Sequence, residues 1–208
     1  MRKLKLKASD FITFLVIFIL VTSIFGLYAN RTDNKQQAPE VSFFYDDVAF
    51  YEQSDGFFGI YLMRSDGQVQ PISFRIDPRT MNDIALEPHL NKKIRNATKI
   101  YTAYNPNLDI SYAKVAIAVG EVTRLLPIIT VNRAVSKGVF SEDSDPINPD
   151  IPIRTCDDAT LEYPLILFDI GDENKVNSDG YCISVIGKDE DDLIRSADRL
   201  GYSFVGIN

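Results

Sequence analysis

The sequence predicts an α/β (or α+β) domain that is exported and held at a membrane by an N-terminal transmembrane helix. Three observations support this prediction. A short basic N-terminus precedes an uncharged apolar segment, aromatic and β-branched runs alternate with Asp-Gly turns, and two later segments show helical periodicity. We therefore expect one domain, residues 41–208, with a mixed β-sheet, an N-terminal β-meander and two or three packing helices.

Charge is distributed unevenly along the 208 residues. Residues 1–10 carry four basic side chains and one acidic side chain, whereas residues 30–208 carry 18 basic and 28 acidic ones, a net charge of −10. A domain of this charge repels polyphosphate, so nucleic acid is a disfavoured partner. His89 is the single histidine, which excludes a multi-histidine metal site within one chain. We predict neither a metal nor a cofactor.

The segment 11–29 contains 19 uncharged, mostly apolar residues. As a helix it would span about 28 Å, close to the thickness of a hydrocarbon core. Basic residues lie only on its N-terminal side, so the positive-inside rule places residues 1–10 in the cytoplasm and the domain outside. We predict a signal-anchor that contacts the lipid bilayer, followed by a polar linker at residues 30–40.

A cleaved signal peptide is the alternative, because a basic start and an apolar run fit that class as well. The apolar run is longer than such a peptide usually has, and the best cleavage candidate, Leu27-Tyr28-Ala29, lacks the small residue usual at its first position. Both interpretations place the domain outside the cytoplasm.

The first part of the domain is predicted to be a β-meander. Three runs rich in aromatic and branched residues, Val41–Glu52, Phe57–Arg64 and Gln68–Ile76, are separated by Ser-Asp-Gly turns at Ser54–Gly56 and Ser65–Gly67. Asp-Gly between apolar runs indicates a hairpin, because glycine tolerates positive φ.

A βαβ unit is predicted next. Lys99–Tyr104 is typical of a buried strand, and Ser111–Leu126 of an amphipathic helix, with Ile128–Val131 as the second strand. Charged residues Lys114, Glu121 and Arg124 would lie on the polar side of this helix. Its apolar face follows i, i+3, i+4 spacing and consists of Tyr112, Val115, Ala116, Val119, Val122 and Leu126.

The last third contains an acidic, proline-rich segment, residues 141–152, which we predict to be an exposed loop. Two strands follow, Tyr163–Ile170 and Tyr181–Gly187. The last helix should begin at Asp189, a good N-cap followed by three acidic residues that suit the positive end of the helix dipole. It could end at Gly201, but the apolar spacing favours a helix that runs to about Gly206.

Two cysteines, Cys156 and Cys182, lie in the exported part. An even number of cysteines in an oxidising compartment predicts a disulfide. A cysteine nucleophile is the alternative, yet the carboxylates of Asp157 and Asp158 would raise the pKa of the adjacent thiol. A redox pair is a further alternative, although the sequence contains no Cys-x-x-Cys motif.

Carboxylates supply the remaining candidate sites. Asp157, Asp158, Asp169 and Asp172 are weak candidates for a catalytic pair, and the plainer interpretation is polar turns. The acidic segment also carries carboxylates, at Glu142, Asp143, Asp145 and Asp150, but their spacing matches no EF-hand, so a solvated loop is predicted rather than a calcium site.

Asn96-Ala97-Thr98 matches the N-glycosylation sequon and makes Asn96 the glycosylation candidate. The sequon at Asn30 lies against the predicted membrane, where a glycosylating enzyme has poor access. His89 is predicted to be an exposed loop residue.

The sequence contains five short motifs, Ser73–Arg79, Thr155–Thr160, Gly180–Ile183, Asp192–Ile194 and Ala197–Leu200. Together these motifs resemble those of small membrane-anchored envelope proteins of archaea whose function is uncharacterised. The resemblance covers about residues 40–208 and implies an anchor, an exported α/β domain and a paired cysteine, without an activity to transfer.

Three classes of function fit these observations. The leading hypothesis is a non-enzymatic envelope interaction or assembly module with a protein partner. The second is an extracytoplasmic carboxylate-dependent hydrolase, which requires Asp157 or Asp158 to face Asp169 or Asp172 across a pocket. The third is a ligand-binding sensor domain that acts through a partner.

Overall fold

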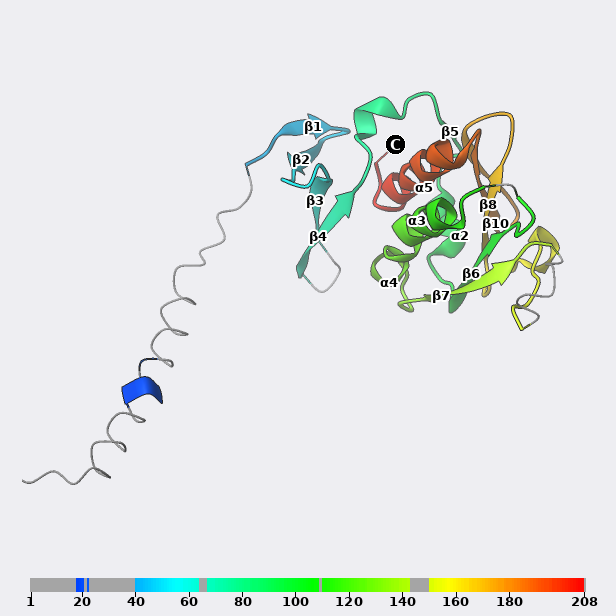
Figure 1. Cartoon of the computed structure of the whole chain (residues 1–208), viewed down its shortest axis with the longest axis horizontal. Coiled ribbons are helices and arrows are strands. Elements are labelled where there is room, and N and C mark those ends of the chain that lie inside the picture. The colour runs from blue at the N-terminus through cyan, green and yellow to red at the C-terminus, as the bar shows by residue number, and fades with distance from the viewer. Residues whose placement is uncertain are drawn as a thin grey trace, which may run out of the picture. The chain divides into compact units, whose positions relative to one another are not determined.

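The structure is a computed structural model that describes residues 18–20, 22, 40–63, 67–108, 110–142 and 150–207. The chain divides into two compact units, Met1–Glu40 and Val41–Asn208, drawn in Figure 1. In the first unit Phe18–Leu20 and Thr22 are helical, while the rest of the predicted anchor 11–29 lies outside the described residues. Within the described residues, no helix has the length and apolar character needed to cross a bilayer.

An antiparallel sheet of four strands in sequence order forms the first part of Val41–Asn208 and confirms the predicted meander. Its strands are β1 (Phe43–Tyr45), β2 (Val48–Glu52), β3 (Phe58–Met63) and β4 (Val69–Phe74). The prediction of one strand over Val41–Glu52 is wrong, because the chain reverses at Asp46 and Asp47, whose φ angles are 49° and 59°. Aspartate tolerates this left-handed conformation better than most residues. The turn at Gly56 is confirmed, with a φ of 82°.

A mixed six-stranded sheet forms the second part, in the order β5-β9-β10-β8-β6-β7. Strands β10, β8, β6 and β7 are mutually parallel, β9 is antiparallel to β10, and β5 is parallel to β9. The bounds are β5 (Ala85–Leu86), β6 (Lys99–Tyr104), β7 (Val135–Phe140), β8 (Leu165–Ile170), β9 (Lys175–Asp179) and β10 (Cys182–Gly187).

The sequence prediction was right for β6, β8 and β10 and missed β5, β7 and β9. Residues 128–131 do not form a strand, because Leu126–Ile129 is the short helix α4, in which Pro127 supplies a φ suited to a first helical turn. The second strand of the βαβ unit is instead β7. The polar strand β9 was not predicted, because pairing with β5 and β10 overrides its weak β propensity.

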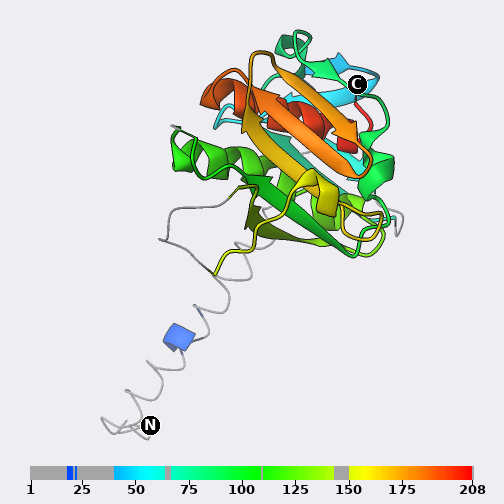
Figure 2. The ribbon, with the colours of Figure 1, turned by 90° about the vertical axis from the view of Figure 1, so that its right-hand side faces the viewer.

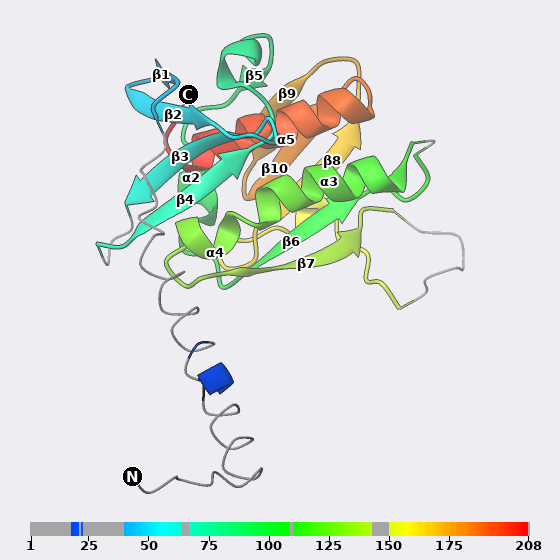
Figure 3. The ribbon, with the colours of Figure 1, turned by 60° about the vertical axis from the view of Figure 1, so that its left-hand side comes forward.

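Two long helices, α3 (Tyr112–Thr123) and α5 (Glu190–Phe204), pack against each other and lie between the two sheets (Figure 3). The domain therefore has three layers, with the main hydrophobic core around the helices. The short helices are η1 (Pro78–Thr80), α2 (Leu90–Ile94), α4 (Leu126–Ile129) and η2 (Cys156–Asp158).

Helix α5 begins as predicted. The Asp189 side chain accepts hydrogen bonds from the backbone N–H groups of Asp191 and Asp192. The helix continues past Gly201 and ends at Phe204, in line with the longer prediction. A Cβ at Gly201 would lie 3.1 Å from Leu125 Cδ1 and 3.2 Å from Phe74 Cε1, so this glycine permits the close packing of α5.

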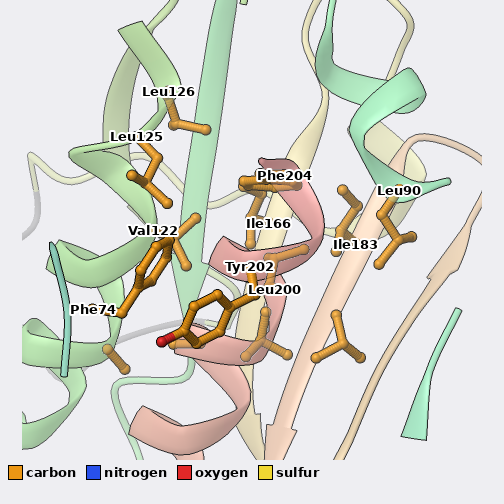
Figure 4. Close-up of a cluster of buried hydrophobic side chains, with 14 of the residues drawn as sticks. Phe74, Leu90, Val122, Leu125, Leu126, Ile166, Ile183, Leu200, Tyr202 and Phe204 are labelled. Atoms are coloured by element: carbon orange, nitrogen blue, oxygen red, sulfur yellow. The ribbon is translucent and has the colours of Figure 1, made fainter. Parts of the chain in front are cut away.

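The meander packs on α5 through aromatic rings (Figure 4). The rings of Phe74 and Tyr202 stack with centroids 3.9 Å apart, and Phe50 lies 6.0 Å from Tyr202. The Tyr202 hydroxyl donates a hydrogen bond to the Ile76 carbonyl at 2.8 Å. Stacked rings of this kind favour a fixed orientation as well as burial.

The predicted apolar face of α3 is confirmed in part. Val115 and Val122 are buried as predicted, together with Ala118, whereas Tyr112 is 57% exposed. Glu121, which was expected on the polar side, is buried and pairs with Arg75 Nε at 3.1 Å and Arg124 Nη2 at 2.7 Å. Two guanidinium groups compensate the desolvation of this carboxylate, which allows it to face the meander.

The opposite face of the six-stranded sheet carries a smaller core. In Figure 2 the short helix η2, in yellow, lies in front of this sheet. The predicted disulfide between Cys156 and Cys182 is present, with the two Cα atoms 5.1 Å apart. It ties η2 to the start of β10, and Cys182 is fully buried beside Leu165 and Ala103.

Candidate functional site

A cavity of about 660 Å³ lies where the end of β3, helices α2 and α4, the loop before β7 and the end of α5 come together. Its apolar lining comes from three separate parts of the chain. These residues are Leu62, Met63, Pro127, Ile128, Ile129, Val131, Phe204 and Val205. Met63 is 74% exposed, so the apolar surface continues to the mouth of the cavity.

Among the described residues, the charged side chains of the cavity are all basic. Lys92, Arg95 and Arg133 line it, and no described aspartate or glutamate does. This grouping contrasts with the acidic composition of the domain. All three side chains are exposed, and none forms an ion pair with a described residue. Eight basic side chains elsewhere in the described domain pair with carboxylates, namely Arg75, Arg79, Lys93, Lys114, Arg124, Arg154, Lys175 and Arg195. Four others, Lys99, Lys137, Lys188 and Arg199, form no ion pair with a described residue, but they do not line this cavity.

Hydrogen bonds hold the two basic segments together. The Val131 N–H donates to the Arg95 carbonyl at 2.9 Å, and the Asn132 side chain donates to the Asn96 carbonyl at 3.0 Å. The Thr130 hydroxyl donates to the Leu126 carbonyl and accepts from the Ala134 N–H. The loop that carries Arg133 is therefore attached to the end of α2 and to α4.

The backbone at this cavity is unusual in two places. His89 and Arg133 have φ angles of 66° and 51°, and both line the cavity. A left-handed conformation costs an L-residue with a Cβ roughly 1–2 kcal/mol. Residues held in this way are concentrated at ligand-binding and catalytic sites, because the surrounding structure fixes them there. His89 is exposed and precedes α2, as its predicted loop position implies.

The carboxylates that were candidate catalytic residues lie in two separate places. Asp157 and Asp158 belong to η2, which the disulfide attaches beside the start of β8. Asp169 lies four residues further along β8, a separation of about 13 Å along the strand, and Asp172 follows the strand. None of the four lines the cationic cavity.

The local contacts of these carboxylates have structural explanations. The Thr155 N–H donates to Asp158 Oδ2 at 2.8 Å and, with nearby Arg154, lowers the pKa of that carboxyl. Burial raises the pKa of Asp169. Asp157 and Asp172 are exposed. Across the described residues, no group of three or more histidine, cysteine, aspartate or glutamate side chains is placed to hold a metal ion.

The glycosylation candidate Asn96 is exposed directly after α2. A glycan at this position would border the mouth of the cavity, because Asn96 is adjacent to Arg95 in the chain and its carbonyl is bonded to Asn132. Glycosylation of Asn96 stays a prediction.

Sequence reasoning did not find Lys92, Arg95 and Arg133. A signal existed in the basic stretch Asn91-Lys92-Lys93-Ile94-Arg95 within an acidic domain, but Arg133 lies 38 positions beyond Arg95 and joins it only in the folded chain. Chemically, the cavity offers cations for an anionic group and an apolar surface for a hydrophobic one. Comparison of the chain with protein-family models, curated proteins and solved structures finds no match.

Proposed function

We propose that this chain is a membrane-anchored extracytoplasmic binding module, whose domain captures an anionic group with an apolar portion in the cationic cavity. The observation that carries the proposal is the convergence of Lys92, Arg95 and Arg133, which pair with no described carboxylate, on one partly apolar cavity. Exposed cations that attract no neighbouring carboxylate remain available for an external anion.

The membrane anchor in this proposal rests on the sequence. The uncharged segment 11–29 has the length of a membrane span, and basic residues precede it. The resemblance to membrane-anchored archaeal envelope proteins and a disulfide in the domain favour the same location.

Fractionation of cells that produce the full chain tests this location. We expect the chain to remain in the membrane fraction after alkaline carbonate extraction and to become protease-sensitive in intact cells stripped of any outer wall. Protein of the full-length mass that is released by carbonate would contradict the anchor. Release of a product lacking about the first 29 residues would instead indicate a cleaved signal peptide.

The cavity is tested by calorimetric titration of the full chain, in nonionic detergent, with naphthyl phosphate as the probe. The triple variant Lys92→Gln/Arg95→Gln/Arg133→Gln is expected to bind it at least tenfold more weakly than the wild type, because the phosphate loses its charge-assisted partners. Added salt should weaken wild-type binding, since exposed charges are screened.

A matched control changes net charge by the same amount away from the cavity. Lys114→Gln/Lys175→Gln/Lys188→Gln should bind the probe as the wild type does. Equal loss of binding in the two triple variants would show that net charge rather than the cavity governs binding. That result would contradict the proposed site.

A further inference from the structure

The acidic segment at residues 142–150 has the composition that the cationic cavity would bind. It carries Glu142, Asp143, Asp145 and Asp150, with no basic residue, and one apolar side chain, Ile147, lies among them. The structure describes Glu142 and Asp150, whereas residues 143–149 lie outside its described part. Pro146 and Pro149 restrict the chain, which reduces the entropy lost when such a segment binds.

The cavity and the acidic segment lie at opposite ends of β7, which is one of the two edge strands of the six-stranded sheet. Arg133 comes just before β7, and Glu142 comes just after it. The six residues of β7 span about 20 Å. Figure 3 shows α4, which contributes to the cavity, at one end of this strand.

The backbone of the acidic segment is too short to enter the cavity of its own molecule. The Phe140 N–H donates to the Pro152 carbonyl at 3.1 Å, and the Arg154 N–H donates to the Phe140 carbonyl at 2.8 Å. The segment therefore leaves and rejoins the domain at the same end of β7. Its nine residues, extended out and back, reach about 15 Å at most, which is less than the length of β7.

We propose that the occupant of the cationic cavity is the acidic segment 142–150 of a second copy of this chain. This inference rests on the proposed function and specifies the partner of the same cavity. Carboxylates of the segment meet Lys92, Arg95 and Arg133, and Ile147 meets the apolar lining. Because the two surfaces differ, the contact is heterologous and joins copies head to tail. Anchoring in one membrane would raise their effective concentration.

Sedimentation velocity of the full chain in nonionic detergent at low ionic strength tests the proposal with two variants. The cavity variant is Lys92→Gln/Arg95→Gln/Arg133→Gln, and the segment variant is Glu142→Gln/Asp143→Asn/Asp145→Asn. We expect the wild type to form larger species as its concentration rises. Each variant alone should be monomeric, with a dissociation constant raised at least tenfold.

An equal mixture of the two variants distinguishes a head-to-tail contact from a symmetric one. The cavity variant keeps its acidic segment and the segment variant keeps its cavity, so the mixture should form a one-to-one heterodimer that grows no further. The control Asp172→Asn/Glu173→Gln/Asp191→Asn should associate as the wild type does. Unchanged melting temperatures would show that the variants remain folded.

Three results would overturn the proposal. They are a wild type that is monomeric at every concentration, variants that associate as the wild type does, and a mixture without heterodimers. If naphthyl phosphate still binds to a monomeric wild type, the proposed function stands and only the partner is wrong. Amine labelling of Lys92 gives a further distinction. If the wild type is monomeric and Lys92 is protected from the label only in phosphatidylglycerol bilayers, the cavity binds a lipid surface rather than a second copy.

Discussion

Replacing Cys156 and Cys182 together with alanine is expected to lower the free energy of unfolding by about 3.5 kcal/mol. The disulfide closes a loop of about 27 residues, and in the chain-entropy model its loss returns that much conformational freedom to the unfolded chain. For a unit of this size the melting temperature should fall by about 7–14 °C. Thermal unfolding followed by circular dichroism measures the change.

Reductant provides the matched comparison. Dithiothreitol should lower the melting temperature of the wild type towards that of the double alanine variant and leave the variant unchanged. Alanine is preferred to serine because Cys182 is fully buried and a hydroxyl there would lack a partner. A wild type whose stability is insensitive to complete reduction would show that the bond does not stabilise the fold.

Asp198→Ala is expected to lower the free energy of unfolding by about 3 kcal/mol. Asp198 Oδ2 accepts hydrogen bonds from the backbone N–H groups of Arg75 and Ile76 at 2.8 and 2.7 Å, and these bonds attach the end of β4 to α5. Alanine would leave two donors without a partner, at a cost of about 1–3 kcal/mol each when they are buried. Urea unfolding at about pH 5 is the measurement, and a loss below ~1 kcal/mol would contradict this role.

The variant Asp198→Asn is the control that keeps the two hydrogen bonds of Asp198 and removes its charge. Its side-chain carbonyl can accept from the same two N–H groups, so at about pH 5 it should retain most of the stability that alanine loses. The amide also carries no charge next to the buried carboxylate of Glu121. A loss as large as that of alanine would show that the two hydrogen bonds are not what Asp198 contributes.

The same residue predicts a dependence of stability on pH. Burial, with the nearby Glu121 carboxylate, raises the pKa of Asp198 to about 7, while Arg124 and the two N–H donors act in the opposite direction. The folded state therefore binds the proton more tightly than the unfolded state. The resulting contribution of Asp198 to the free energy of unfolding is fully present below about pH 4, declines as pH rises to about 7 and is absent above that. Its upper bound is about 4 kcal/mol.

The difference between the wild type and Asp198→Asn isolates this contribution from the other carboxylates. Asp77 and Asp158 have lowered pKa values, and their contributions to stability are lost as pH falls. Both proteins share those contributions. The wild type should lose stability relative to Asp198→Asn between about pH 4.5 and pH 8. A constant difference over this range would show that Asp198 titrates normally.

Three features follow from the sequence because their determinants are local or unambiguous. Strand β6 is a continuous run of β-forming residues, and α5 has an N-cap at Asp189 together with a regular apolar stripe. The disulfide follows from there being only two cysteines in the chain. Neither the strand nor the helix depends on which distant segment packs against it.

Other features depend on partners that are distant in the chain. Strand β9 exists because β5 and β10 pair with its polar sequence, and Glu121 can be buried because Arg75 reaches it from the meander. No local pattern around either segment signals those partners. The hairpin at Asp46 was missed for a different reason, since two adjacent aspartates are a weaker turn signal than Asp-Gly.

The candidate site also depends on contacts between segments that are distant in the chain. The sequence by itself determined that the domain is acidic and that Lys92 and Arg95 lie close together in the chain. Only the tertiary structure brings Arg133 beside them and places all three on a cavity with an apolar lining. The physical reason is that hydrogen bonds between the loop before β7 and the end of α2, together with packing at the end of α5, join segments that no sequence periodicity connects.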